Sequence, residues 1–246
     1  MPKYFVEKSN IKDGCIIINN DENFHHIKNV MRAKVGMEIY IGDKENNNYK
    51  CSISEIDKES LTLRIIENIE IDVEPAIDVV LFAPIIKGEK MEWVIQKAVE
   101  LGVAKIIPVI TKHCVVKIES EKKAYAKVER WNKISESAAK QSGRGITVEI
   151  ANPMKLNEAL KLAKDKLDAS VIPYEKENAQ TFKSFLRGAD VKSLGIFIGP
   201  EGGFASEEIK LAEQFGVIPV TLGKIILRSE TASIVSIAIA IYETNN

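Results

Sequence analysis

The sequence predicts an α/β protein in which a small β-barrel precedes a parallel β-sheet covered by helices on both faces. Two observations predict this division. Short runs of alternating or β-branched residues fill the first part of the chain, whereas largely apolar strands alternate with helices from Ile77 onward. The chain has 246 residues, of which 45% are hydrophobic and 28% charged, and this length accommodates one large or two small cores.

The first domain, residues 1–70, is predicted to be a barrel of strands interrupted by one helix. Asp21 is placed to cap this helix, and Gly36 lies beyond its end. The apolar residues of the helix are spaced for a single stripe and comprise Phe24, Ile27, Val30 and Met31. The strands are expected at Lys3–Glu7, Cys15–Asn19, Met37–Ile41, Tyr49–Ile56 and Leu61–Glu67.

The second domain, residues 71–246, is predicted to contain the parallel sheet, and the boundary is expected within Asn68–Pro75. Its strands show no polar alternation, which is typical of strands buried on both faces. They are expected at Ile77–Phe82, Lys105–Ile110, Thr147–Ile150, Ala169–Ile172, Leu194–Ile198 and Val217–Thr221. The helices are expected at Glu89–Leu101, Glu121–Gln141, Leu156–Lys166, Ala179–Leu186 and Ser206–Phe215, followed by a buried apolar helix at Ala232–Tyr242.

Composition argues against several classes of protein. The 34 basic and 35 acidic residues leave a net charge of −1, so the surface is not uniformly positive, although a local nucleic-acid face remains open. Cys15, Cys51 and Cys114 form no Cys-x-x-Cys pair, so we expect no disulfide framework, no metal site and a reducing, cytoplasmic setting. The N-terminus lacks a signal-peptide pattern, and the apolar run near the C-terminus is shorter than a membrane span of about 20 residues. We therefore expect no membrane association.

Positive charge is concentrated in one stretch of the chain. Residues 105–144 contain 10 basic and 4 acidic side chains. A basic helix of this kind can lie along a phosphate backbone, although a merely solvated helical face has the same charge pattern. Arg144 follows this helix in the loop Gln141–Gly145, between two glycines that allow the backbone to approach a ligand.

The strongest local signal is the loop Ile198–Phe204 (IGPEGGF), which joins a predicted strand to a predicted helix. It lies at the carboxyl end of a strand in a parallel sheet, where ligands bind, although a plain strand-to-helix turn has similar punctuation. The glycine patterns of phosphate-binding loops are missing, and Glu201 would repel a phosphate. A cationic ligand such as the sulfonium of S-adenosylmethionine fits this loop better.

A second irregular segment follows the last predicted strand, at Thr221–Ala232. Apolar side chains in it can line a slot for a flat ring, and Gly223 permits close approach of the backbone. Arg228 and Glu230 are candidates for electrostatic and proton-transfer roles, although a salt-bridged helix start explains the same pair. Ser229 or Thr231 is placed to cap the final helix.

Several separated strings, in the right order over the whole chain, resemble one family of enzymes. They are HHI at His25–Ile27 with VMR at Val30–Arg32, KAVELGV at Lys97–Val103, AAKQSGR at Ala138–Arg144, GPEGGF at Gly199–Phe204 and ILRSETA at Ile226–Ala232. These strings resemble the ribosomal small-subunit RNA methyltransferase E family. Met31 and Ser229 replace the Leu and Thr that are more usual there, and neither change puts the activity in doubt.

The resemblance implies a SPOUT-type methyltransferase domain whose C-terminal segment forms a trefoil knot, a PUA-like barrel at the N-terminus, and a homodimer. It also implies methylation of N3 of one uridine in 16S ribosomal RNA of the small subunit, with S-adenosylmethionine as methyl donor. Threaded chains are rare, so the residues alone do not predict the knot.

Site residues follow from the loops and the resemblance together. Arg228 is expected to stabilise the anion that develops on the base, and Glu201 or Glu230 to help accept the N3 proton. The cofactor is expected at Ile172, Pro173, Ile198, Gly199, Pro200, Gly202, Gly203, Leu222, Gly223, Ile226, Leu227 and Arg228. RNA is expected at His26, Arg32, Lys87, Lys112 and Arg144, although His25 and His26 also fit as core and rim residues of a small helix.

Three alternatives remain at this point. A non-catalytic RNA-binding factor would need no small-molecule slot, which the two loops supply. A nucleotide-dependent oxidoreductase lacks its glycine fingerprint here and would meet Glu201. A SPOUT methyltransferase that acts on another RNA, such as transfer RNA, has the same sequence features.

Overall fold

The computed structural model describes residues 3–19, 21–116 and 120–244, which form two compact units. One unit consists of Met1–Glu74 with Ala139–Thr147, and the other of Pro75–Ala138 with Val148–Asn246. The segment 139–147, which the sequence placed in the second domain, therefore belongs to the first unit. An isolated β-bridge between Glu45 and Ile146 joins this segment to a loop of the first unit.

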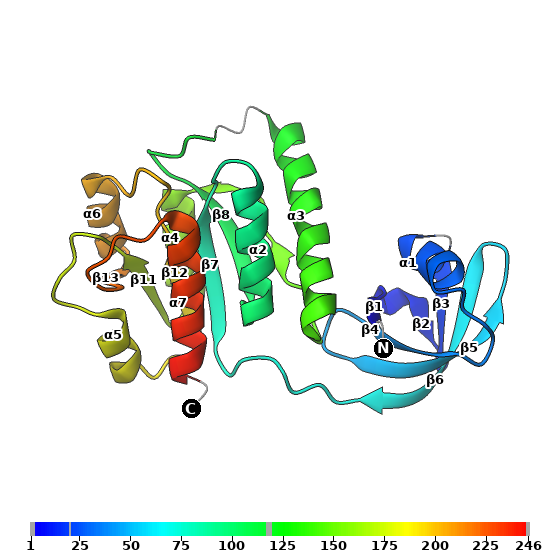
Figure 1. Cartoon of the computed structure of the whole chain (residues 1–246). Coiled ribbons are helices and arrows are strands. Elements are labelled where there is room, and N and C mark those ends of the chain that lie inside the picture. Colours follow the sequence, from blue (N-terminus) through cyan, green and yellow to red (C-terminus); the bar gives the residue numbers. More distant parts are fainter. Residues whose placement is uncertain (1–2, 20, 117–119, 245–246) are drawn as a thin grey trace. The chain divides into compact units, whose positions relative to one another are not determined.

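The first unit is a curled sheet with the strand order β1-β4-β5-β6-β3-β2 (Figure 1). Neighbouring strands are antiparallel except β1 and β4, which are parallel. Alternate residues such as Ile16 and Ile18 of β3 point inward and are fully buried, which is the period of a strand with one buried face. The strands are β1 (Lys3–Phe5), β2 (Ile11–Lys12), β3 (Cys15–Asn19), β4 (Glu38–Gly42), β5 (Asn48–Ile56) and β6 (Ser60–Ile69), with a short 3-10 turn at Lys8–Asn10.

The predicted helix of this unit is α1 (Glu22–His25), which continues as a π-helical turn at His26–Val30. Asp21 caps it as predicted, since its carboxylate accepts the Phe24 N–H at 2.8 Å. The predicted apolar stripe is wrong at Val30, whose side chain is 68% exposed. A π turn carries more residues than an α turn, so it rotates Val30 away from the core that Phe24 and Ile27 enter.

The second unit contains the predicted parallel sheet, in the order β10-β8-β7-β12-β11-β13, with β9 paired to β8. Every recorded pair in it is parallel. Its strands are β7 (Asp78–Pro84), β8 (Lys105–Ile110), β9 (Glu149–Ile150), β10 (Met154–Lys155), β11 (Ala169–Pro173), β12 (Ser193–Phe197) and β13 (Ile218–Val220). Its helices are α2 (Glu89–Leu101), α3 (Glu121–Ser142, whose end belongs to the first unit), α4 (Leu156–Lys166), α5 (Phe182–Gly188), α6 (Ser206–Gln214) and α7 (Ser229–Thr244).

Helices cover both faces of this sheet, as the apolar strands predict (Figure 1). Val80 and Phe82 of β7 pack into one core with the apolar residues of α4 and α6. Val79 and Leu81 alternate with them and are buried toward the other face, where α7 contacts β7 and also packs on α2. No described helix has the length and the apolar character that a membrane crossing requires.

Helix α5 starts later than predicted. The sequence places its beginning at Ala179, but residues 179–181 are not helical. The backbone there is engaged in tertiary pairing instead, because Thr221 donates its N–H to Gln180 and accepts the N–H of Phe182. This pairing brings the loop after β11 against the segment after β13, where the site lies.

Candidate functional site

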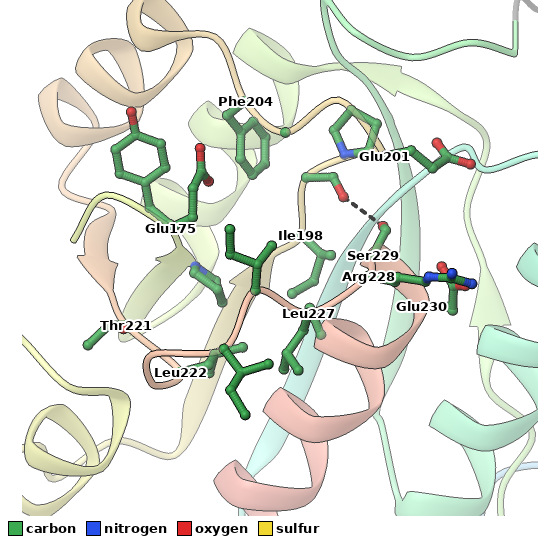
Figure 2. Close-up of a pocket in the computed structure, with 18 of the residues that line it drawn as sticks. Glu175, Ile198, Glu201, Phe204, Thr221, Leu222, Leu227, Arg228, Ser229 and Glu230 are labelled. Atoms are coloured by element: carbon green, nitrogen blue, oxygen red, sulfur yellow. Dashed lines mark hydrogen bonds between the residues drawn. The ribbon is translucent and has the colours of Figure 1, made fainter. Parts of the chain in front are cut away.

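A cavity of about 870 Å³ lies at the carboxyl ends of β11, β12 and β13 (Figure 2). Its walls are the loop after β12, the segment after β13, the loop after β11 and the first turn of α7. The two glycine-bearing segments that the sequence singled out are therefore brought together, in the position where parallel sheets bind ligands.

The loop after β12 closes as a tight turn. The Gly203 N–H donates to the Pro200 carbonyl at 2.9 Å, and Gly203 has φ of +67°, a conformation that side chains rarely adopt. Gly199 is constrained differently, since an added Cβ would lie 3.1 Å from the ring of Phe204. Glycine is thus needed at one position for its backbone conformation and at the other for space.

The segment after β13 forms the apolar wall. Leu222 and Leu227 line the cavity together with Ile198 (Figure 2). Gly223 has φ of +124°, and its N–H donates to the Thr221 hydroxyl at 3.1 Å. Ile226 also borders the cavity but is 80% exposed, so it contributes to the rim more than to the wall.

Ser229 joins the two segments. Its buried hydroxyl donates to the Gly199 carbonyl at 2.6 Å, the dashed line in Figure 2. The sequence suggests Ser229 as one of two candidate caps of the final helix. In the structure, Ser229 is the first residue of α7, and its side chain binds the neighbouring loop. The start of α7 is therefore fastened to the turn that lines the cavity.

Charged groups gather at the start of α7. The Lys90 ammonium lies 3.2 Å from Glu230 Oε1, while Glu230 Oε2 is buried without a hydrogen-bond partner among the described residues. The backbone N–H of Glu230, followed by Lys90 and Arg228, lowers the pKa of this carboxyl, and burial opposes the shift. Glu230 is therefore ionised at neutral pH, beside two cations.

The structure places the predicted cofactor residues around this cavity with one exception. Ile172 is fully buried in the core between the sheet and α4 and α6, and the next residue, Pro173, reaches the cavity instead. The proposed catalytic residues Glu201, Glu230 and Arg228 all line the cavity. The remaining lining residues on the predicted list are Ile198, Gly199, Pro200, Gly202, Gly203, Leu222, Gly223, Ile226 and Leu227.

Several lining residues are absent from the predicted list, and two of them, Glu175 and Lys90, carry charge that bears on the site. Glu175 lies two residues beyond Pro173, and its carboxylate oxygens are 3.8 and 3.9 Å from the place of a Cβ on Gly203. The rule that ligands bind at the carboxyl ends of parallel strands could have identified it. Lys90 lies in the first turn of α2, far from both loops in sequence, and no local pattern marks it as a partner of Glu230.

The predicted RNA-binding residues are divided between the two units. His26 and Arg32 of the first unit are exposed, and His26 Nδ1 lies 2.8 Å from the Tyr4 hydroxyl. In the second unit, Lys87 is exposed in the loop before α2, and Lys112 forms an exposed ion pair with Glu207, which raises the pKa of the Lys112 ammonium. Residues 117–119 of the predicted basic stretch lie outside the described residues.

Arg144 has a different environment from the one expected. Its guanidinium is 5% exposed and forms a two-point ion pair with Glu74, with Nη2 to Oε2 at 2.5 Å and Nε to Oε2 at 3.1 Å. Its carbonyl accepts the Lys3 ammonium at 2.6 Å. The sequence predicted that the Arg144 guanidinium reaches a phosphate from a loop between two glycines, whereas the structure buries this arginine inside the first unit. Contact of Arg144 with RNA stays a prediction.

Metal ligands are not grouped in the part of the chain that the structure describes, where no three His, Cys, Asp or Glu side chains are placed to hold an ion. The cavity offers instead an apolar wall, backbone groups of a glycine turn, and carboxylates with cations near its rim. Such a site suits a small organic ligand that combines an apolar ring with charged groups.

Comparison with known proteins identifies the family. A family model described as an RNA methyltransferase domain matches residues 73–241, and one described as an RNA methyltransferase PUA domain matches residues 18–66. The ribosomal RNA small subunit methyltransferase E of Bacillus subtilis (strain 168) is 34% identical over 252 residues, which cover 99% of this chain and 97% of the relative. That of Mesomycoplasma hyopneumoniae (strain 232) is also 34% identical and covers 95% of this chain and 96% of the relative.

Solved structures agree with this result. A putative methyltransferase from Legionella pneumophila with bound S-adenosylmethionine matches with a TM-score of 0.84 and 30% identity, over 97% of this chain and 96% of that chain. The ribosomal RNA small subunit methyltransferase E of Neisseria gonorrhoeae, bound to S-adenosylmethionine, matches with a TM-score of 0.83 and 28% identity, over 97% and 95%. The chain belongs to the ribosomal RNA small subunit methyltransferase E family.

Proposed function

We propose that this RNA methyltransferase transfers a methyl group from S-adenosylmethionine to N3 of a uridine in 16S ribosomal RNA of the small subunit. The observation that carries the proposal is the single cavity formed by the glycine turn and the segment that ends in Arg228 and Glu230. Membership of the family and the bound cofactor of two structural relatives support the choice of methyl donor.

The cavity fits S-adenosylmethionine in both shape and charge. Leu222, Leu227 and Ile198 supply an apolar slot for a flat ring. Glu201 lies in the glycine turn and Glu175 lies against it, so negative charge flanks the loop. These carboxylates would repel a phosphate and attract the sulfonium and ammonium groups of the cofactor. Lys90, Lys224 and Arg228 also line the cavity, so this negative charge is local to the glycine turn.

When bound, S-adenosylmethionine supplies an electrophilic methyl group. The protein must remove the proton of uridine N3 and stabilise the negative charge that spreads over N3, O2 and O4. Arg228 is exposed at the cavity rim, where its guanidinium can approach these oxygens. The backbone N–H of Glu230, followed by Lys90 and Arg228, lowers the pKa of this carboxyl, so it is a weak proton acceptor, and its ion pair orients Lys90. We assign removal of the N3 proton to the carboxylate of Glu201, which is exposed to water in the turn.

The apolar face of α7 supports the proposed homodimer. Ser233 and Ser236 of this helix are buried within their own chain, whereas Ile234, Val235 and Ile239 remain partly exposed. Ile237 of α7 is fully buried within its own chain, so these three partly exposed residues form a second apolar face of the helix, which a second subunit would cover. A fully active monomer in sedimentation at low concentration would contradict this part of the proposal.

The remaining parts of the proposal concern topology, RNA and location. The pairing of Thr221 with residues 180–182 and the bond from Ser229 to Gly199 are contacts expected of a C-terminal trefoil knot.

We propose that RNA contacts His26 and Arg32 of the PUA-like domain together with Lys87 and Lys112. We also propose that the protein acts in the cytoplasm, where ribosomal subunits assemble. Residues 1–70 and 71–246 are the proposed PUA-like and methyltransferase domains, subject to the exchange of residues 139–147 described above.

The decisive experiment uses tritiated S-adenosylmethionine and small ribosomal subunits that lack the modification. We expect one equivalent of tritium per subunit, located by nuclease mapping at one uridine and identified as 3-methyluridine by mass spectrometry. Transfer RNA is the competing substrate and is expected to remain unlabelled. Label in transfer RNA, or in a base other than uridine, would overturn the assignment of the substrate.

A further inference from the structure

A residue in the turn after β8, His113, binds the glycine loop from outside the cavity. His113 Nδ1 lies 3.2 Å from the Gly202 carbonyl oxygen and 3.1 Å from that of Gly203. Carbonyl oxygens only accept hydrogen bonds, so Nδ1 must carry the hydrogen, which it shares between the two. His113 is not among the residues that line the cavity, so it contacts the loop on the side away from the cavity.

A buried carboxylate fastens the same two segments a few residues further along the loop. Glu208 Oε1 accepts the backbone N–H of Lys112 at 2.8 Å, and Glu208 Oε2 accepts the backbone N–H of Ala205 at 2.9 Å. The Glu208 side chain is held in place because the residue is only 9% exposed. The backbone position of His113 is therefore set relative to the loop, and its ring is presented to the two glycine carbonyls.

The glycines need such a constraint. Two adjacent glycines have more backbone freedom than any other pair of residues, and a ligand that orders them loses affinity for doing so. His113 also limits the space available, because a Cβ on Gly202 would lie 3.1 Å from the Cβ of His113. The contact thus both requires glycine at this position and restrains it.

We infer that His113 is a positioning residue for the cofactor: through Gly202 and Gly203 it orders the glycine turn before S-adenosylmethionine binds. This inference rests on the proposed function, because it assumes that the turn contacts the cofactor. It assigns His113 to affinity for the cofactor and gives it no part in the chemical step.

The test is calorimetric titration with S-adenosylmethionine of the wild-type protein and of two variants at this position. His113→Ala removes one hydrogen bond, and we expect about fivefold weaker binding. His113→Asn places a side-chain N–H at the same distance from the backbone as Nδ1, so we expect near wild-type affinity. In steady-state assays, His113→Ala should raise the KM for S-adenosylmethionine about fivefold, with kcat and the KM for small subunits unchanged.

Glu213→Gln is the control on the same helix, α6, since Glu213 is exposed and lies beyond the turn that contacts His113. Its affinity for S-adenosylmethionine should equal that of the wild type. Wild-type protein that does not bind S-adenosylmethionine would overturn the proposed function itself. Normal binding by both the wild type and His113→Ala would overturn the positioning role alone. A loss of kcat and of thermal stability that Asn does not restore would also overturn it, by showing a structural role.

Discussion

The backbone of Gly203 sets a strict requirement on one residue of the cavity. Its φ of +67° is unfavourable for any side chain and most unfavourable for a β-branched one. We expect Gly203→Val to weaken binding of S-adenosylmethionine at least tenfold, because the turn must change its conformation, while the PUA-like domain stays folded. Calorimetry with circular dichroism checks both points. Gly188→Val is the control, since φ there is not positive and no atom lies within 4 Å of the added Cβ.

Arg228 is expected to carry the largest single effect on the chemical step. A positive group aimed at developing negative charge contributes about 100-fold or more to a rate, so Arg228→Ala should lower the single-turnover rate by that order. Glu201→Gln should lower it less, because water can also take the proton. Both are measured with saturating cofactor, so that weaker binding does not contribute. Unchanged rates in both variants would show that the catalytic roles are assigned wrongly.

Lys90 is expected to control the pH range in which Glu230 stays ionised. The pKa of Glu230 is lowered first by its own backbone N–H and then by Lys90, so Lys90→Met should raise this pKa part of the way to its ordinary value. In this variant the Glu230 carboxylate is therefore protonated at a higher pH than in the wild type. The acid limb of the pH–rate profile should move to higher pH in Lys90→Met, with little change at pH 8. An unmoved acid limb would remove Glu230 from the mechanism.

At the scale of elements, one hydrogen bond fastens helix α7 to the glycine turn. Ser229→Ala deletes the bond to the Gly199 carbonyl and leaves that carbonyl without this partner. We expect a loss of about 1 kcal/mol in the free energy of unfolding and a higher KM for S-adenosylmethionine, since helix and loop separate more easily. Urea titration measures the first effect. Ser9→Ala, an exposed position in the first unit, should change neither quantity.

Elements whose own sequence determines them were predicted well. Helices α2 and α4 have the predicted bounds, because each is amphipathic and the first ends at Gly102 in the left-handed conformation. Elements whose limits depend on distant residues were predicted less well. Helix α5 begins late because residues 180–182 pair with Thr221, and Val30 leaves its stripe in a π turn. No local pattern contains that information.

The same distinction holds for the site. The two loops of the cavity were found from glycines, a proline and their places at strand ends, all of which are local features. The sequence did not identify three residues that support these loops, namely Lys90, His113 and Glu208. Each of them contacts its partner across about 90 to 140 residues of chain. The sequence shows which residues can do chemistry, while the fold determines which neighbours tune them.

On the scale of the whole molecule, the chain enters the first unit twice, and the ion pair of Glu74 with Arg144 joins the two passages. The pair is largely buried, so removal of the Glu74 carboxylate breaks a desolvated, hydrogen-bonded ion pair and costs about 3–5 kcal/mol. Lys3 contacts the same residues: burial lowers its pKa to about 8, and Glu74 opposes that shift. The unit should therefore tolerate loss of Glu74 poorly.

We expect Glu74→Gln to unfold the PUA-like unit at a lower denaturant concentration while the methyltransferase unit still binds S-adenosylmethionine. Between pH 8 and 10.5 the unfolded chain holds the Lys3 proton more tightly than the folded one, so Lys3 makes stability rise with pH there. Glu74→Gln should extend this rise to lower pH, since Glu74 supports the charged form of Lys3. Denaturant titrations at several pH values, followed by cofactor titration of the partly unfolded protein, measure both. Coincident loss of both units would show that the segment 139–147 couples them into one folding unit.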